Sequence, residues 1–95
     1  MVFDVSKISG IGKFEEKKEK ERLLFAVNEK TFLVINKNTF EVRCDLELSK
    51  LLQEKYESVM QSRYFGRGGI EIVDSGQLED SEIEDLIRLS YNLSR

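Results

Sequence analysis

Apolar residues in the first half of the chain recur at the spacing of β-strands. Three stretches carry this pattern, at residues 23–27, 31–35 and 39–44. The last alternates strictly, because Phe40, Val42 and Cys44 fall on one side of the strand. Short polar segments at residues 28–30 and 36–38 separate the stretches and suit tight turns. The pattern therefore predicts an antiparallel meander of three strands.

The spacing of apolar residues changes to that of helices after Asp45. This residue is a good N-cap, and Glu47 follows in the first turn. The apolar face of the predicted helix consists of Leu48, Leu51, Leu52 and Val59, with Tyr56 at its border. A second helix is predicted to begin near Asp80 or Ser81, where Ser81 and Glu84 match a capping box. Its apolar face consists of Ile83, Leu86, Ile87 and Tyr91, with Leu93 near the end.

A fourth strand is predicted between the two helices. The glycine-rich tract at residues 66–69 ends regular structure, and Ile70 and Ile72 then alternate with Glu71. The resulting order, β-β-β-α-β-α, predicts an α+β fold in which helices pack on one face of an antiparallel meander. A chain of 95 residues suits a single domain, spanning residues 1–95.

The N-terminal part of the chain follows neither spacing. Residues 13–22 form a mixed-charge run, which suits a solvated turn between strands or a mobile loop. A short helix is the alternative, since Glu and Lys favour one. Residues 2–14 leave room for an additional strand or extended segment.

The absent residue types narrow the chemistry. The chain has no histidine and one cysteine, so it cannot build a Ser-His-Asp or Cys-His arrangement or an internal disulfide, and an ordinary zinc site is disfavoured. No Walker-type phosphate loop, secretory signal pattern or apolar run of roughly 20 residues occurs. We therefore expect a cytoplasmic, non-enzymatic protein with no cofactor, no metal and no membrane partner.

Charge is distributed unevenly along the chain. The formal net charge of −3 disfavours strong nonspecific binding to nucleic acid. Two of the 15 basic residues and seven of the 18 acidic residues lie from Glu71 onward. Residues 1–70 therefore contain 13 basic and 11 acidic residues. That net of +2 is compatible with a locally basic surface.

Several motifs occur in an order and spacing that resemble the MmcQ/YjbR family. They are the hairpin at residues 22–35, the Cys44-Asp45 entry into a helix, the glycine tract at residues 66–70, and Ser90-Tyr91. The resemblance covers about residues 22–95. It implies the family's α+β fold and its "double-wing" DNA binding, and it brings no established reaction. The chain departs from the family in a shortened N-terminus and in Ile70, which stands where the family usually has tryptophan.

The loop at residues 62–69 is the first candidate for a binding site. Arg63 and Arg67 can grip phosphate, Gly68 allows close approach of a backbone, and Tyr64 could stack on a base. The competing interpretation is a plain glycine-rich connection, with solvated arginines and the neighbouring phenylalanine in the core.

The meander supplies a second group of candidates. Its basic residues, which could face a DNA duplex, are Arg22, Lys30, Lys37 and Arg43. Glu29 and Glu41 interrupt this face, so an ordinary solvated strand face is the competing interpretation.

Three further features have plain structural interpretations beside functional ones. Cys44 could be a reactive thiol, but its phase with Phe40 and Val42 indicates a core residue. The acids of the last helix could bind a cation or a basic partner, and they also suit the helix dipole. Tyr91 is predicted to pack in the core and to pair its hydroxyl at the surface.

The predicted function is therefore that of a non-enzymatic binding protein. The residues expected to contact double-stranded DNA are Arg63, Tyr64, Arg67, Gly68, Lys30, Lys37 and Arg43. The alternative is a protein-interaction module without a nucleic-acid role. Because the N-terminus is short, we also expect an uncovered apolar face that makes the protein a homodimer.

Overall fold

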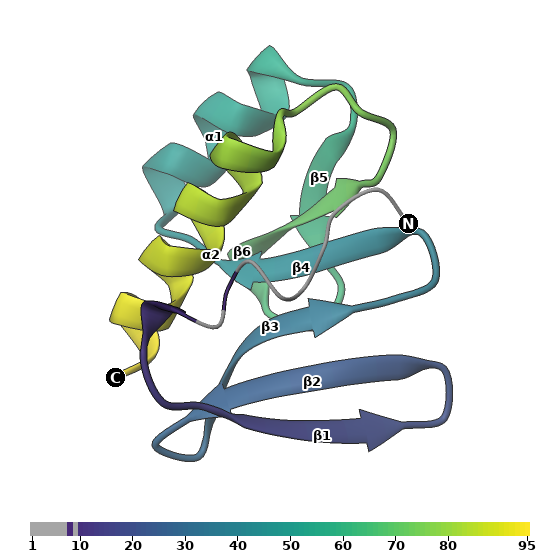
Figure 1. The fold of residues 1–95 in the computed structure, drawn as a ribbon. Coiled ribbons are helices and arrows are strands. Elements are labelled where there is room, and N and C mark those ends of the chain that lie inside the picture. The colour runs from purple at the N-terminus through teal and green to yellow at the C-terminus, as the bar shows by residue number, and fades with distance from the viewer. Residues whose placement is uncertain (1–7, 9) are drawn as a thin grey trace.

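The computed structural model describes Ile8 and residues 10–95, which form an α+β fold (Figure 1). Six strands make one antiparallel sheet in the order β1-β2-β3-β4-β6-β5. The elements are β1 (Glu15–Glu19), β2 (Arg22–Val27), β3 (Lys30–Ile35), β4 (Thr39–Arg43), α1 (Leu46–Lys55), β5 (Val59–Ser62), β6 (Gly66–Val73) and α2 (Asp80–Ser94). The predicted meander over β2, β3 and β4 and the predicted fold class are confirmed.

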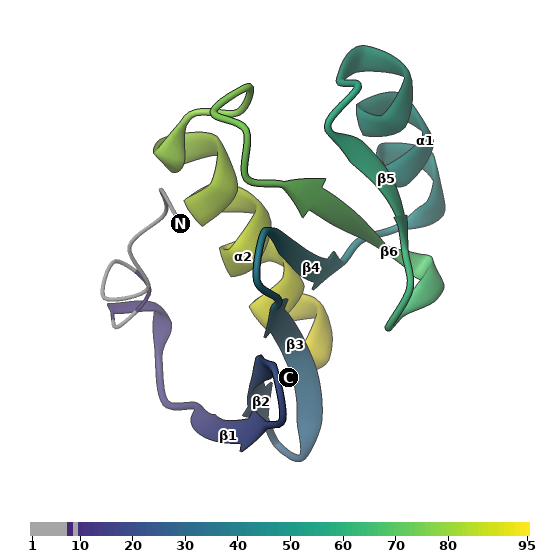
Figure 2. The same ribbon diagram turned by 90° about the vertical axis from the view of Figure 1, so that its right-hand side faces the viewer.

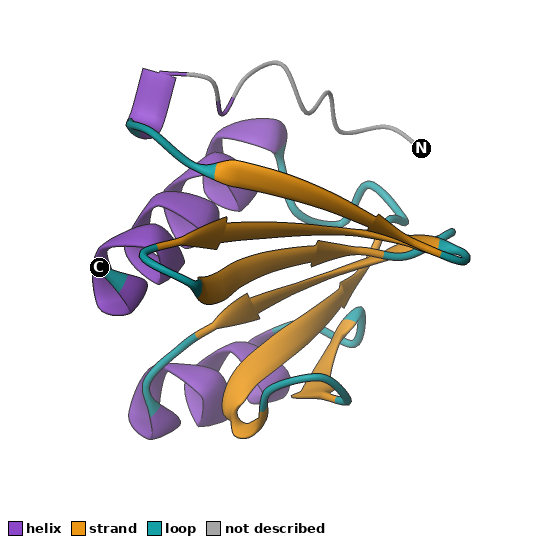
Figure 3. Ribbon diagram, turned by 90° about the horizontal axis from the view of Figure 1, so that it is seen from below, coloured by secondary structure: helices purple, strands orange, loops and turns teal. Residues whose placement is uncertain are grey.

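Both helices pack on the apolar face of the sheet. The alternating residues Phe40 and Val42 of β4 lie beside Ile72 and Ile70 of β6, and all four are buried in one core. Helix α2 packs against β3 and β4, while α1 packs against β5 and β6. In Figure 3 both helices lie toward the left and the strands extend from them to the right. Figure 2 shows how strongly the sheet twists between β2 and β5.

Two neighbouring residues of α2 tie the helix to the sheet and to the N-terminal segment. The hydroxyl of Ser90 donates to the carbonyl of Phe32 at 2.6 Å and accepts from the backbone N–H of Arg43 at 2.7 Å. The Tyr91 ring packs against that of Phe32, and its hydroxyl donates to the carbonyl of Lys13 at 2.9 Å. The prediction for Tyr91 is confirmed, and Ser90 satisfies backbone groups of two strands at once.

The mixed-charge run is a strand, and the expectation of a loop or short helix there was wrong. Strand β1 pairs with β2 along its whole length, from Glu15 opposite Ala26 to Glu19 opposite Arg22. Its side chains are mostly exposed, so no apolar alternation marks it. A charged strand at the edge of a sheet also resists pairing with other chains. Residues 10–14 lead into β1 without a strand, and the rest of the predicted 2–14 segment, apart from Ile8, lies outside the described residues.

The region between the helices also differs from the sequence-based prediction. Helix α1 ends at Lys55, and Val59 begins strand β5 instead of extending the helix. The glycine tract does not end regular structure, because residues 66–69 belong to β6 and pair with β4 and β5. Leu51 was expected in the core but is 62% exposed, whereas Leu48 and Leu52 are half-buried against it.

The N-terminus of α2 is capped by other residues than predicted. Glu79 is the N-cap, and it forms a capping box with Glu82 in place of the expected Ser81 and Glu84. The hydrogen bond from the Glu79 N–H, with that from the Tyr56 hydroxyl, lowers the pKa of Glu82. Leu93, placed near the apolar face by the sequence, is exposed. None of the helices in the described part of the chain has the length and apolar character needed to span a membrane.

Candidate nucleic-acid interface

Two carboxylates are buried side by side on the sheet face that lies opposite the helices. Glu41 of β4 and Glu71 of β6 are direct partners in the antiparallel register and are 2% and 1% exposed. Like charges placed directly opposite each other destabilise a sheet, and buried charges need partners. The surrounding donors must therefore offset both costs.

Glu41 is held by a ring of neutral donors. Its carboxylate accepts from the Asn36 amide, the Ser62 hydroxyl and the Tyr64 backbone N–H, each at 2.8 Å. Burial by itself raises the pKa of this group, but these hydrogen bonds outweigh burial and the pKa of Glu41 is lowered. The side chain is thus an anion that binds the backbone of the β5–β6 loop.

Glu71 is held by a cation from the same loop. Arg63 donates to its two oxygens from Nε at 2.9 Å and from Nη2 at 2.7 Å, and the Thr39 hydroxyl adds a bond of 2.7 Å. The hydrogen bond to Glu71 also raises the pKa of Arg63. The Arg63 side chain is nevertheless 73% exposed, so it covers the buried carboxylate and faces solvent at the same time.

These contacts fold the β5–β6 loop, residues 63–65, over the open face of the sheet. The Tyr64 hydroxyl lies 3.3 Å from the Thr31 hydroxyl, and the Arg22 guanidinium lies over the Tyr64 ring, 5.2 Å from its centroid. Phe65 packs under the guanidinium of Arg43 at 4.9 Å. The loop thereby bridges from β5 across the sheet to β2.

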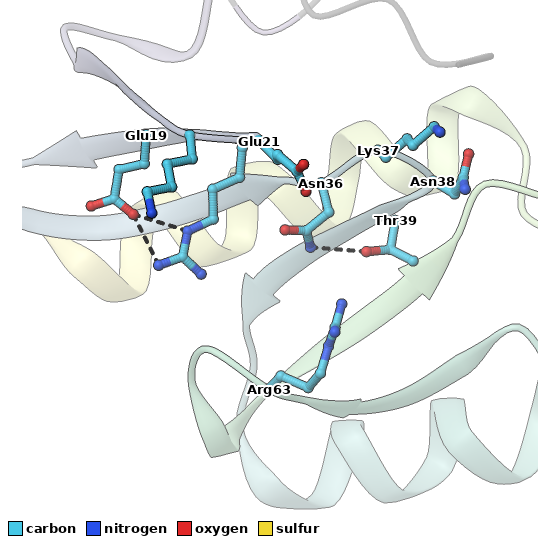
Figure 4. A pocket seen from close by; sticks show the side chains of 9 residues that line it. Glu19, Glu21, Asn36, Lys37, Asn38, Thr39 and Arg63 are labelled. Carbon is cyan, nitrogen blue, oxygen red and sulfur yellow. Dashed lines mark hydrogen bonds and ion pairs between the residues drawn. The ribbon is translucent and has the colours of Figure 1, made fainter.

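A groove of about 820 Å³ opens beside this loop (Figure 4). Its lining residues come from the β1–β2 turn, the β3–β4 turn and the loop, and they are Glu19, Lys20, Glu21, Arg22, Asn36, Lys37, Asn38, Thr39 and Arg63. Both turns lie at the right-hand end of the sheet in Figure 1. Figure 4 shows Arg63 pointing from below toward Asn36 and Thr39. All nine lining residues are polar or charged types, and cations reach the groove from three separate segments.

The structure divides the predicted DNA-contacting residues between two ends of the sheet. Lys37 and Arg63 line the groove, and Tyr64 lines a smaller recess that adjoins it. The other predicted residues lie where β3 and β6 begin and β4 ends, and they are Lys30, Arg43, Arg67 and Gly68. Because neighbouring strands are antiparallel, these positions share the end of the sheet opposite Lys37.

Arg43 and Gly68 already have structural partners at that opposite end. The Arg43 Nε donates to the carbonyl of Thr31 at 2.8 Å while its guanidinium covers Phe65. The carbonyl of Gly68 accepts from the Cys44 N–H at 2.9 Å. Lys30 and Arg67 are exposed. A DNA contact by these four residues stays a prediction.

The sequence singled out Arg22, Lys37 and Arg63, but it did not single out the other charged residues that organise the groove. Lys20 lay in a run expected to be a loop, and Glu41 and Glu71 occupied the solvent phase of their strands. A pair of acids at matching positions of two strands, with Arg63 eight residues before Glu71, is the only signal that could have suggested the network. That signal needs the register of β4 against β6, which the sequence does not specify.

The described residues do not assemble a recognisable metal site or reactive thiol. No group of three or more Cys, Asp or Glu side chains among them is arranged to hold a metal ion. Burial, together with the charge of Asp45, raises the pKa of Cys44 to about 11. The thiol is therefore protonated near neutral pH and packs in the core, as predicted from its strand phase.

Replacing Glu41 with glutamine tests the network through its pH dependence. Since the folded pKa of Glu41 lies below its usual 4.5, its contribution to stability is present above that pH and is lost as pH falls through the folded pKa. We expect Glu41→Gln to lower the free energy of unfolding at neutral pH by about 1–3 kcal/mol, because an amide donor replaces an acceptor. The difference from wild type should shrink below pH 4.5.

Urea denaturation at several pH values measures this effect. Glu47→Gln, at an exposed position of α1, is the matched control and should stay close to wild type throughout. A constant difference between Glu41→Gln and wild type from neutral to acid pH would contradict an ionised Glu41.

Comparison with known proteins identifies relatives of the fold but brings no activity. The family model for YjbR matches residues 12–93. The crystal structure of Deinococcus radiodurans protein DR2400, with a domain described as DUF419, is similar at a TM-score of 0.76 and 17% identity. The match covers 93% of this chain and 72% of that one. No curated protein matches the sequence.

Proposed function

Since the chain belongs to the YjbR family, we propose that it is a non-enzymatic DNA-binding protein whose interface is the groove on the open face of the sheet. The observation that carries this proposal is the convergence of four cations from three turns. Lys20 comes from the β1–β2 turn and Arg22 from the start of β2 beside it, Lys37 from the β3–β4 turn, and Arg63 from the β5–β6 loop. Two hairpin turns that reach the same end of a sheet can lie against the two strands of a duplex, as the double-wing description of the family implies.

The charge balance of the groove supports a modest, salt-dependent affinity. Four bases and two acids, Glu19 and Glu21, line it, and the buried carboxylates Glu41 and Glu71 bring the local net charge to zero. Phosphate contacts of this number release few counterions, so the logarithm of the affinity should fall gently with the logarithm of salt concentration. The whole chain is acidic, so DNA binding requires a local cluster of cations such as the one in this groove.

The proposal predicts that neutralising two lysines of the groove weakens DNA binding. Both are exposed, so Lys20→Gln/Lys37→Gln should fold normally. If each lysine contacts one phosphate, the slope of log affinity against log salt should become shallower by about two units. Fluorescence anisotropy of a short labelled duplex, at two or more salt concentrations, measures both affinity and slope.

The matched control carries the same loss of charge at the other end of the sheet. Lys30→Gln/Arg67→Gln should keep the wild-type slope if the groove is the interface. A larger effect in this control would move the interface to the β6 end. No binding by wild type at low salt would remove the DNA proposal.

A protein-interaction module is the second candidate, and one observation favours it. Large apolar side chains are exposed on the helices, at Leu46 and Leu51 of α1 and at Leu89 and Leu93 of α2. Exposed apolar groups of this kind are common at contact surfaces when they form a continuous patch. Self-association through this side of the molecule stays a prediction. It would be supported if the protein did not bind DNA and its mass in solution exceeded that of one chain.

A further inference from the structure

A recess of about 360 Å³ adjoins the groove and brings two arginines together. It is lined by Arg22, Asn36, Glu41, Arg63 and Tyr64. Arg22 reaches it from β2 and Arg63 from the β5–β6 loop, and both residues also line the larger groove. The recess is thus a part of the groove that both arginines line.

Each guanidinium is oriented by a carboxylate that binds one of its sides. Arg22 uses Nε and Nη2 to bind Oε1 of Glu19, both at 2.9 Å. Arg63 uses the same two nitrogens to bind Glu71. The bonds to the two carboxylates use Nε and Nη2, so Nη1 of each arginine takes no part in them. The Tyr64 ring adds a third constraint on Arg22, since the guanidinium lies over it.

We propose that Arg22 and Arg63 form a clamp for a single phosphate group, with Glu19 and Glu71 as the residues that position them. The inference rests on the proposed DNA-binding function and names the chemical group that the groove recognises. The planar guanidinium fork binds the oxygens of phosphate with defined geometry, which an ammonium group does not. A guanidinium already held on one edge loses little conformational freedom when its other edge binds a ligand.

The Glu41 carboxylate at the edge of the recess sets a condition on the ligand. Its oxygens already accept hydrogen bonds from Asn36, Ser62 and the Tyr64 N–H. Glu41 therefore repels a bound anion and makes no hydrogen bond to it. Glu19 and Glu71 add two further negative charges on the arginines themselves, so one arginine alone would be strongly opposed in binding an anion. Both guanidinium groups are therefore required, and removal of either fork should weaken binding.

The test replaces each guanidinium group by the ammonium group of lysine, which leaves the net charge unchanged. Arg22→Lys changes a half-buried side chain that is 41% exposed, and Arg63→Lys keeps a cation over Glu71, so both variants should fold. Arg88→Lys, on the exposed side of α2, is the matched control. Nuclear magnetic resonance of the arginine Nε–H groups follows inorganic phosphate, and fluorescence anisotropy follows a short duplex with and without 5′-phosphates.

For a clamp, inorganic phosphate should shift the Nε–H resonances of Arg22 and Arg63 and leave that of Arg88 in place. Arg22→Lys and Arg63→Lys should each weaken duplex binding by about tenfold, with no change for Arg88→Lys. Tighter binding of the 5′-phosphorylated duplex would identify a terminal phosphate monoester as the ligand. Equal binding of both duplexes would identify an internal phosphodiester.

The opposite outcomes separate failure of the clamp from failure of the proposed function. Duplex binding that is the same in wild type and both lysine variants overturns the clamp and leaves a nonspecific basic groove. Resonances of Arg22 and Arg63 that do not move with phosphate also overturn it. Shifts with phosphate but no affinity for any duplex would support the clamp and remove DNA as its ligand.

Discussion

Replacing Phe32 with alanine should lower the free energy of unfolding by about 4 kcal/mol, the largest loss expected from a single side chain. Phe32 is 0% exposed, and its ring packs edge-on against Phe14 at 5.9 Å and Tyr91 at 5.2 Å between centroids. Truncation would leave a cavity where β3, α2 and the N-terminal segment meet. Since small domains are stable by roughly 5–15 kcal/mol, such a loss should be visible in a urea denaturation curve.

Leu51→Ala is the informative control for this prediction. The helical spacing placed Leu51 in the core, but in the structure its side chain faces solvent. Its removal should change the free energy of unfolding by less than about 0.5 kcal/mol. Similar losses for Phe32→Ala and Leu51→Ala would contradict the packing of α1 described above.

A methyl group at Gly69 should destabilise the protein by about 3 kcal/mol, because β6 has no room for it. A Cβ built at Gly69 would lie 2.5 Å from the carbonyl oxygen of Val42 and 2.7 Å from Cβ of Phe65. Either the β4–β6 ladder or the β5–β6 loop must move. Displacement of the loop would also disturb Arg63, so DNA affinity should fall together with stability.

Gly68→Ala separates this steric effect from the general cost of replacing a glycine. A Cβ at Gly68 would lie 3.6 Å from the carbonyl oxygen of Phe65, an ordinary contact. We expect its melting temperature to stay near that of wild type. If both variants melt alike, the close approach of Phe65 and β4 to Gly69 is not a determinant of stability.

The meander was predictable because the sequence of its strands shows the apolar pattern of a sheet and the sequence between them shows turns. In β4, Phe40 and Val42 face the helices, while β3 is apolar from Phe32 to Ile35, and polar turns separate the strands. In the β2–β3 turn, Asn28 and Glu29 take the left-handed conformation that such turns require. Strand β1 has no such apolar pattern. It is an edge strand that pairs with β2 through its backbone, while its charged side chains stay in water.

The groove was predictable only in part, because its residues meet through tertiary contacts. The composition of the β5–β6 loop drew attention to Arg63 and Tyr64, which line the recess on the open face. Glu41 and Glu71 looked like solvent-facing strand residues, and their burial arises from the loop that folds over them. Lys30 and Lys37 looked equivalent in the sequence of the meander. In the structure, Lys30 begins β3 and Lys37 follows its other end, so the two lysines lie at opposite ends of the sheet.

The most direct test of the central claim is a map of backbone amide shifts during titration with a short DNA duplex. We expect shifts concentrated in the β1–β2 turn, the β3–β4 turn and residues 63–65, which surround the groove. These shifts should reverse when salt is added, because salt weakens contacts to phosphate. Shifts confined to α1 and α2, or to the start of β6 around Arg67, would contradict the assignment of the groove as the interface. The absence of any shift at low salt would contradict DNA binding itself.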